Sequence, residues 1–234
     1  MIKTAIVAGG RGVRMKPLTD TMPKPMFPVG GKPLLEHQLE WLKASGVSEA
    51  ALCLGYKAEA VTSYFGDGAR WGVKLSYSVE TVARGTAGSI KDLPGAADGD
   101  LLVVYGDLHL SMDLAPLLKF HRSHSGAATL VVIASDHPLD SDLVSLDGDR
   151  ITGFYRAKPG QPYENWAAAA VWVLRPALLE LIPADRPTDF GRDTFPEALK
   201  RGLELRAYRT TEPIEDLGTP ERCERFLKAW EARS

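Results

Sequence analysis

The hydrophobic residues of the chain fall into short runs that alternate with amphipathic segments. Nine runs rich in Val, Ile, Leu and Ala have the length and composition of β-strands. Between them, leucines spaced by three and four positions predict a helix over residues 33–45, with Pro33 near its start and Gly46 after its end. Residues 114–124 and 219–232 show the same helical pattern. The predicted strands are 3–8, 50–55, 73–79, 101–105, 128–134, 144–146, 151–156, 167–174 and 204–209.

This alternation of strands and helices is typical of an α/β fold. Residues 101–104 and 129–133 are apolar on both faces, which suits strands of a mostly parallel sheet covered by helices. We therefore predict a single domain over residues 1–234, a Rossmann-like α/β/α sandwich with a mixed, mostly parallel central sheet. The strands in about 140–175 have a more antiparallel pattern and are expected as an elaboration of that sheet.

Composition narrows the class of protein without identifying it. The chain has 234 residues, 44% of them hydrophobic, and a net charge of −2, which is typical of a soluble globular domain. A pI of about 6.2 excludes a globally basic nucleic-acid-binding protein. No apolar run approaches the ~18 residues of a membrane span, and Cys53 and Cys223 lack the spacing of a metal site or a disulfide framework. We expect a cytoplasmic protein with no nucleic-acid partner and no membrane partner.

The charged residues are distributed unevenly along the sequence, and basic residues are concentrated in and after the first predicted strand. Residues 1–32 hold six Lys or Arg side chains and one Asp, a net charge of +5, so the remaining residues carry −7. Three glycines directly after the strand let backbone N–H groups approach an anion, and the neighbouring guanidinium groups bracket phosphate oxygens. This loop predicts a polyphosphate ligand. Its residues are Ala8, Gly9, Gly10, Arg11, Gly12 and Arg14.

The loop is neither of the two commonest phosphate-binding loops. Gly31 and Lys32 are followed by Pro33 and lack the glycine spacing of a P-loop. Met15 stands where the dinucleotide-binding fingerprint requires its third glycine. The pattern therefore argues against both P-loop kinases and dinucleotide-dependent dehydrogenases.

The run GGRGVRMKPLTDTMPKPMFPVGGKPLLEH, residues 9–37, resembles the signature of the sugar-1-phosphate nucleotidylyltransferase family. Further matching segments follow in the same order: FGDG at 65–68, GTAGSI at 85–90, YGD at 105–107, KP at 158–159 and EDLGTP at 215–220. The resemblance spans nearly the whole chain. It implies a fold of the nucleotide-diphospho-sugar transferase type and the condensation of a nucleoside triphosphate with a sugar 1-phosphate, giving a nucleotide sugar and pyrophosphate.

The resemblance also suggests which substrates to expect. Residues 136–143, DHPLDSDL, resemble a stretch of guanylyltransferases that act on heptose 1-phosphate. We therefore favour GTP with D-glycero-D-manno-heptose 1-phosphate or mannose 1-phosphate. The expected partners are these small molecules, and a homodimer is a compatible assembly.

By the same resemblance, Arg14 would stabilise the triphosphate and the transition state, and Lys24 would contact the phosphates near the reacting centre. The backbone of residues 9–12 would hold the leaving pyrophosphate, with Arg11 assisting. Asp107 and Asp216 would bind Mg²⁺, the expected cofactor, because a divalent cation neutralises and orients the triphosphate. A second nucleotide-binding loop would hold the nucleobase and ribose with Gly85, Thr86, Ala87 and Gly88.

Two departures from the family pattern fall on the sugar side of the expected site. Lys158 matches the lysine that contacts the sugar-linked phosphate, but Ala157 precedes it where the family has Glu. Ala168 stands where an Asn of the family would hold the sugar, and Asn165 or Glu164 is the nearest substitute. These differences leave the nucleotide chemistry intact and put the identity of the sugar in doubt.

Other interpretations of the same residues remain open. Asp107 and Asp216 would also serve as a turn residue and a helix cap, and residues 85–89 as a simple helix start. At the level of function, the altered sugar-side positions leave open a catalytically silent relative that binds sugar nucleotides and regulates a partner. A UTP- or dTTP-using branch of the family is another alternative. A glycosyltransferase is disfavoured, because residues 106–109 lack the second acid of an Asp-x-Asp metal motif.

Overall fold

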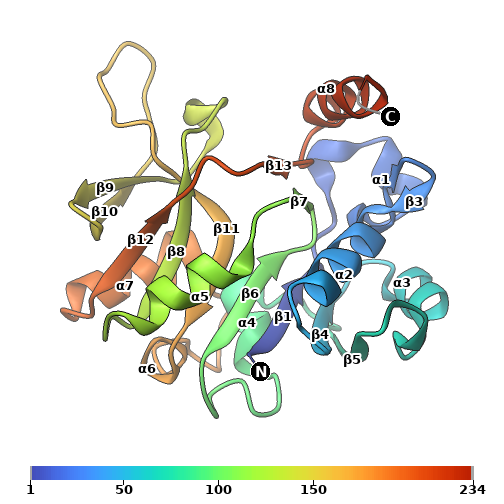
Figure 1. Ribbon diagram of the computed structural model, residues 1–234, viewed down its shortest axis with the longest axis horizontal. Coiled ribbons are helices and arrows are strands. Elements are labelled where there is room, and N and C mark those ends of the chain that lie inside the picture. The colour runs from blue at the N-terminus through green and yellow to red at the C-terminus, as the bar shows by residue number, and fades with distance from the viewer. Residues whose placement is uncertain (1, 233–234) are drawn as a thin grey trace. The chain divides into compact units, whose positions relative to one another are not determined.

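The computed structural model describes residues 2–232, and the chain folds into two compact units, each assembled from segments that are distant in the sequence (Figure 1). The first unit comprises Met1–Ala83, Val104–Met112 and Pro213–Ser234, and the second comprises Arg84–Val103 and Asp113–Glu212. Strand β6 (Leu101–Tyr105) supplies its first three residues to the second unit and its last two to the first. The single domain expected over residues 1–234 stays a prediction.

Parallel strands form the centre of the first unit. Strand β4 (Glu49–Leu54) pairs in parallel with β1 (Lys3–Val7) on one side and with β5 (Lys74–Val79) on the other. Parallel neighbours need crossover connections, which here contain the helices α2 (Leu34–Ala44) and α3 (Ala58–Phe65), followed by the 3₁₀ turn η3 (Ala69–Trp71). The predicted leucine face of α2 is fully buried in the core of this unit.

Several short elements of the first unit follow the loop after β1. They are η1 (Val13–Met15), α1 (Leu18–Thr21), η2 (Lys24–Met26) and the hairpin of β2 (Pro28–Val29) with β3 (Lys32–Pro33). Strand β7 (Leu108–Leu110) pairs antiparallel with β13 (Ile214–Asp216), and helix α8 (Pro220–Glu231) comes next. One buried cluster joins these pieces and anchors the loop on an apolar base: Met15, Phe27, Val29, Leu34, Leu217, Cys223 and Phe226.

A mixed sheet forms the centre of the second unit. Strand β8 (Ala128–Ile133) pairs antiparallel with β11 (Ala167–Leu174) and parallel with β12 (Leu205–Arg209). Strand β10 (Arg150–Tyr155) joins β12 to β9 (Leu143–Asp147) through antiparallel ladders. The remaining elements are α4 (Gly85–Lys91), α5 (Leu114–Arg122), η4 (Pro138–Asp140), α6 (Pro176–Leu179), the π-helical turn η5 (Phe190–Thr194) and α7 (Phe195–Lys200).

The pattern of hydrophobic positions predicts the longer elements well. All nine expected strands are present, two of them, 101–105 and 167–174, with their predicted bounds, and the three expected helices are α2, α5 and α8. The mixed α/β architecture is confirmed, and β9, β10 and β11 are antiparallel as expected for about 140–175. Helix α3 lacks the usual sequence signals for a helix start: its N-terminal flanking residue Lys57 has a left-handed φ of 51° and no side-chain cap bond. Among the described residues, no helix is both long and apolar enough to cross a membrane.

Two histidines of α5 and the turn after it share a buried hydroxyl in the second unit. Thr129 Oγ1 lies 2.7 Å from Nδ1 of His121 and 2.9 Å from Nε2 of His124. Nε2 of His121 faces Asp100 at 3.4 Å, and Arg175 donates to the backbone carbonyls of both histidines. Burial, reinforced by the charge of Arg175, lowers the pKa of His121 to about 4, and the same causes lower the pKa of His124. These rings are therefore packing residues that fold in the neutral form.

We predict that the protein loses stability as the pH falls from about 6.5 to about 4. In this window His121 is protonated in the unfolded chain but neutral in the folded chain. Protonation therefore lowers the free energy of unfolding by roughly 2–3 kcal/mol. The free energy of unfolding, measured with urea across this range, should have a smaller pH slope in His121→Gln than in the parent. Carboxylates titrate in both proteins, so the difference isolates His121; equal slopes would contradict the prediction.

Candidate functional site

The glycine loop begins where β1 and β4 approach each other closely. Tyr56 N–H donates to the carbonyl oxygen of Gly9 at 3.1 Å. A side chain at Gly55 would place its Cβ 2.8 Å from that same oxygen, and one at Gly9 would lie 3.2 Å from the backbone N of Gly55. Glycine at both positions therefore lets the loop start flat against the neighbouring strand.

The loop backbone keeps its N–H groups available for a ligand. Across residues 2–232, no hydrogen bond is donated by the backbone N–H groups of residues 9–12. Gly12 adopts a left-handed φ of +61°, and its carbonyl accepts from Met15 N–H at 2.8 Å and from the Thr19 hydroxyl at 2.9 Å. The loop is thus fastened through its carbonyl oxygens while its donors remain for an anion, as a phosphate-binding loop requires.

Lys24 lies beside the glycine loop and pairs with Asp107. A Cβ at Gly12 would meet Cγ of Lys24 at 3.0 Å, so the lysine stem packs on the glycine. The ammonium donates to Oδ2 of Asp107 at 2.8 Å, with the two side chains only 16% and 20% exposed. Asp107 follows Gly106, where a Cβ would lie 2.8 Å from that of Ala8. The structure therefore brings Ala8, Lys24 and Asp107 together, with Asp107 in the turn between β6 and β7 and paired with Lys24.

A backbone hydrogen bond holds the segment of Asp216 against the segment of Asp107. In the β13–β7 ladder Asp216 lies opposite Leu108, and Leu217 N–H donates to the carbonyl oxygen of Asp107 at 2.9 Å. Burial raises the pKa of Asp216, and the neighbouring Asp107 carboxylate raises it further. The N-cap of α8 is Thr219, whose hydroxyl accepts from Arg222 N–H, so Asp216 is not the cap of that helix.

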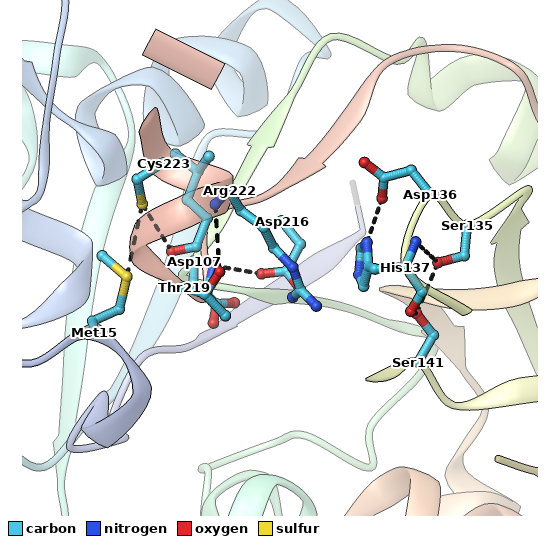
Figure 2. Close-up of polar contacts among 12 residues, drawn as sticks. Met15, Asp107, Ser135, Asp136, His137, Ser141, Asp216, Thr219, Arg222 and Cys223 are labelled. Carbon is cyan, nitrogen blue, oxygen red and sulfur yellow. Dashed lines mark hydrogen bonds and ion pairs between the residues drawn. The ribbon is translucent and has the colours of Figure 1, made fainter. Parts of the chain in front are cut away.

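Two basic side chains lie close to Asp216. Arg222 donates to its Oδ2 (Figure 2). The N–H of Gly218 donates to Oδ1 at 2.6 Å. A Cβ at Gly218 would lie 2.6 Å from Oδ1 of Asp216 and 3.3 Å from Nη2 of Arg14. The exposed Arg14 of η1 therefore reaches the turn after Asp216.

The donor set in the first unit fits a divalent cation. Two neighbouring carboxylates, Asp107 and Asp216, repel each other, and basic side chains already stand against both of them. Mg²⁺ is usually held by one or two carboxylates together with substrate phosphates, so two protein ligands suffice. Within residues 2–232 no group of three or more His, Cys, Asp or Glu side chains forms a site made by protein alone.

Cys223 lies under this site without the properties of a reactive thiol. Its Sγ contacts the carbonyl oxygen of Leu217 at 3.3 Å and Sδ of Met15 at 3.7 Å (Figure 2). Burial, aided by the Asp216 charge, raises its pKa to about 11. The thiol is thus neutral and serves as packing beneath Asp216.

The second predicted nucleotide-binding loop starts helix α4 in the second unit. The N–H groups of Ala87 and Gly88 both donate to the carbonyl oxygen of Thr188, at 2.9 and 3.1 Å. Thr86 donates to Asp189 at 2.7 Å and accepts from Phe190 N–H at 3.1 Å. These residues therefore start a helix that residues 188–190 support, and their nucleotide-binding role stays a prediction.

The predicted sugar-side residues lie in the second unit as well. Lys158 is exposed and follows the buried Ala157. The Asn165 amide exchanges two bonds with the Ser135 backbone: Nδ2 donates to its carbonyl at 2.8 Å, and Oδ1 accepts from its N–H at 3.3 Å. Asn165 therefore holds the segment after β8, where the Ser135 and Ser141 hydroxyls lie 2.8 Å apart (Figure 2).

The sequence pattern does not reveal two residues that build these sites. Arg222 lies among several charged residues at the start of α8 and has no distinguishing local pattern. Asp189, which holds Thr86 and caps η5 by accepting from Arg192 N–H, is about a hundred residues from the loop it supports. Only their position in the fold identifies them.

Comparisons with known proteins give the family and two relatives. The model of the family described as "Nucleotidyl transferase" matches residues 3–231. A mannose-1-phosphate guanylyltransferase of Mycobacterium tuberculosis is 33% identical over 223 residues, 94% of this chain and 62% of that protein. A UTP–glucose-1-phosphate uridylyltransferase of Synechocystis is 30% identical over 234 residues, 93% of this chain and 60% of that protein. The chain thus spans about six tenths of the length of these curated relatives.

Two solved structures share the fold. HddC from Yersinia pseudotuberculosis, complexed with GMP-PN, superposes with a TM-score of 0.81 at 22% identity, covering 98% of this chain and 100% of that one. A UDP-glucose pyrophosphorylase complexed with UDP-glucose gives a TM-score of 0.80 at 19% identity, covering 100% and 98%. At these identities the likeness establishes the architecture alone.

We predict that Gly85→Ala disrupts the start of α4. Gly85 has a φ of +75°, and an added Cβ would lie 2.5 Å from the carbonyl oxygen of Thr188, so both strain and overlap oppose a side chain. The free energy of unfolding, measured with urea, should fall by about 1–3 kcal/mol. Gly99→Ala is the matched control, because a Cβ added there would have no atom within 4 Å and its φ is not positive. Equal stability of the two variants would rule out this account.

Proposed function

Because this chain belongs to the nucleotidyl transferase family, we propose that it condenses a nucleoside triphosphate with a sugar 1-phosphate, releasing pyrophosphate. The observation that carries the proposal is the meeting of a glycine loop rich in available N–H donors with Lys24, Asp107 and Asp216 in one unit. In this reaction an oxygen of the sugar phosphate forms a bond to the α-phosphorus. The bond from that phosphorus to the oxygen of the departing pyrophosphate breaks in line with it.

The chain needs to supply positioning and charge rather than a general base. A sugar phosphate is already an anion at neutral pH, so no proton has to be removed from it before it attacks. Two polyanions must instead approach each other, and fixed donors and cations have to offset their repulsion. This requirement matches a loop of N–H groups flanked by Arg11, Arg14 and Lys24.

Each basic group has a proposed place. The N–H groups of residues 9–12 hold the pyrophosphate as it leaves, with Ala8 at the base of the loop and Arg11 assisting. Arg14 stabilises the triphosphate and the charge that develops in the transition state. Lys24, which pairs with Asp107, contacts the phosphates at the reacting centre.

Asp107 and Asp216 are the proposed ligands of Mg²⁺. When bound, this cation neutralises the triphosphate and holds it for in-line attack. The protein's own contribution is to keep two carboxylates adjacent through the Leu217–Asp107 backbone bond.

The second unit is proposed to recognise the remaining parts of the substrates. The loop of Gly85, Thr86, Ala87 and Gly88 holds the nucleobase and ribose against its backbone. Lys158 contacts the sugar-linked phosphate, and Asn165 contacts the sugar.

A guanine nucleotide and a manno-configured sugar are the proposed specificity. Mannose-1-phosphate guanylyltransferases among the relatives support this choice. A UTP- or dTTP-using enzyme is the second candidate, favoured by the uridylyltransferase relative. Both candidates share the chemistry above and differ in the base and the sugar.

A substrate panel is expected to separate these candidates. Pyrophosphate release should be measured for GTP, UTP and dTTP, each with mannose 1-phosphate, D-glycero-D-manno-heptose 1-phosphate and glucose 1-phosphate. We predict the highest kcat/KM with GTP and one of the first two sugars. Pyrophosphate release with UTP or dTTP but not with GTP would favour the second candidate. No release with any pair, together with calorimetric binding of a nucleotide sugar, would identify a catalytically silent relative.

Arg14→Ala is expected to lower kcat by at least ~10²-fold, the effect of losing one charged contact to the transition state. Lys16→Ala is the matched control, because Lys16 is a nearby exposed cation that pairs only on the surface with Asp20. The control should keep nearly the parent's turnover and the parent's salt dependence. Near-normal kcat in Arg14→Ala would remove Arg14 from the proposed catalytic group.

A further inference from the structure

Asp216 is held on both of its carboxylate oxygens by its own chain. Oδ1 accepts from the Gly218 N–H at 2.6 Å, and Oδ2 accepts from Nη1 of Arg222. The turn that makes this possible requires glycine, because a Cβ at Gly218 would lie 2.6 Å from Oδ1. The orientation of the carboxylate is therefore set before any ligand arrives.

Arg222 is itself fixed by the start of helix α8. Its side chain is only 9% exposed, which is unusual for an arginine. Its backbone N–H donates to the capping hydroxyl of Thr219, which fixes the main chain from which the side chain extends, and Pro220 begins the helix. A buried guanidinium extending from this fixed backbone orients its partner at a smaller cost in side-chain entropy than an exposed cation on a flexible stem.

The carboxylate that Arg222 holds stands next to a second one. Leu217 N–H, directly after Asp216, donates to the carbonyl oxygen of Asp107, so the two aspartates lie on hydrogen-bonded neighbouring segments. Lys24 forms an ion pair with the carboxylate of Asp107, and Arg222 forms one with the carboxylate of Asp216. The orientation of both carboxylates is thus controlled by basic residues from other segments of the first unit.

We infer that Arg222 is a positioning residue that holds Asp216 in the orientation in which it binds a divalent cation together with Asp107. This inference rests on the proposed role of the two aspartates. Two effects of Arg222 oppose each other: its charge repels a cation, and its hydrogen bond orients the ligand. Partners that orient a metal ligand in this way are worth about 10- to 100-fold in metal affinity or activity. The inference is that orientation outweighs repulsion.

Binding of Mn²⁺ alone to the full chain, followed by electron paramagnetic resonance of the free ion, tests this directly. Arg222→Met should weaken Mn²⁺ binding at least ~10-fold, and Arg222→Lys should recover part of the loss because it retains a charged donor. Arg225→Met, which changes an exposed arginine of the same helix, is the matched control and should bind as the parent does. Unchanged or tighter binding in Arg222→Met would overturn the inference.

Kinetics provide a second readout that a purely structural role would not move. The Mn²⁺ concentration for half-maximal pyrophosphate release should rise in Arg222→Met, while kcat at saturating Mn²⁺ and the KM for sugar phosphate stay within about threefold of the parent. A parallel loss in all three quantities would count against positioning. If circular dichroism shows that Arg222→Met does not fold, Arg222→Gln and Arg222→Lys replace it in both measurements.

Asp216→Asn separates this inference from the proposed function. If it binds Mn²⁺ as the parent does, the assignment of Asp216 as a ligand fails, and the role of Arg222 fails with it. If Asp216→Asn loses Mn²⁺ and Arg222→Met does not, the ligand assignment stands and the positioning role alone is wrong.

Discussion

The carboxylates of Asp107 and Asp216 lie near each other in the first unit and repel each other. Much of the surrounding structure offsets this repulsion. The N–H of Leu217, the residue after Asp216, donates to the carbonyl oxygen of Asp107, and this bond keeps the two aspartates close. Burial, and after it the neighbouring Asp107 charge, disfavours ionisation of Asp216 and raises its pKa. Lys24 and Arg222 each supply the opposite charge at hydrogen-bonding distance. Basic residues are therefore required here before any substrate is considered.

The same constraint explains why the glycine loop lies where it does. Lys24 must reach Asp107, and its stem can do so because Gly12 has no side chain in the way. Gly106 plays a matching part, since a Cβ there would overlap that of Ala8. Close backbone approach thus brings the loop donors and the acidic pair into one unit. The formal charges nearly cancel over the whole chain because the +5 of residues 1–32 offsets most of the −7 of the remaining residues.

Periodicity predicts elements that are long enough to repeat a pattern, and this explains both its success and its failures. Strand β11 and helix α2 are predictable because eight and eleven residues carry a regular apolar signal. Strands β7 and β13 have three residues each and carry no period, yet they position both aspartates. Resemblance to a family motif identifies Asp107 and Asp216 as candidate site residues. It does not predict the Leu217–Asp107 backbone bond that brings them together, because that bond joins chain segments about a hundred residues apart.

The sugar side illustrates a different limit, because one side chain there can serve two purposes. The sequence indicates Asn165 or Glu164 as a sugar contact, and in the structure the amide of Asn165 bonds twice to the backbone of Ser135. A side-chain amide has two N–H donors and two acceptor lone pairs, so these bonds use one of each. One donor and one acceptor remain on an exposed residue, which is enough for a sugar hydroxyl. Holding the segment after β8 therefore fixes the direction of the amide, so that a ligand bound there would not have to order it.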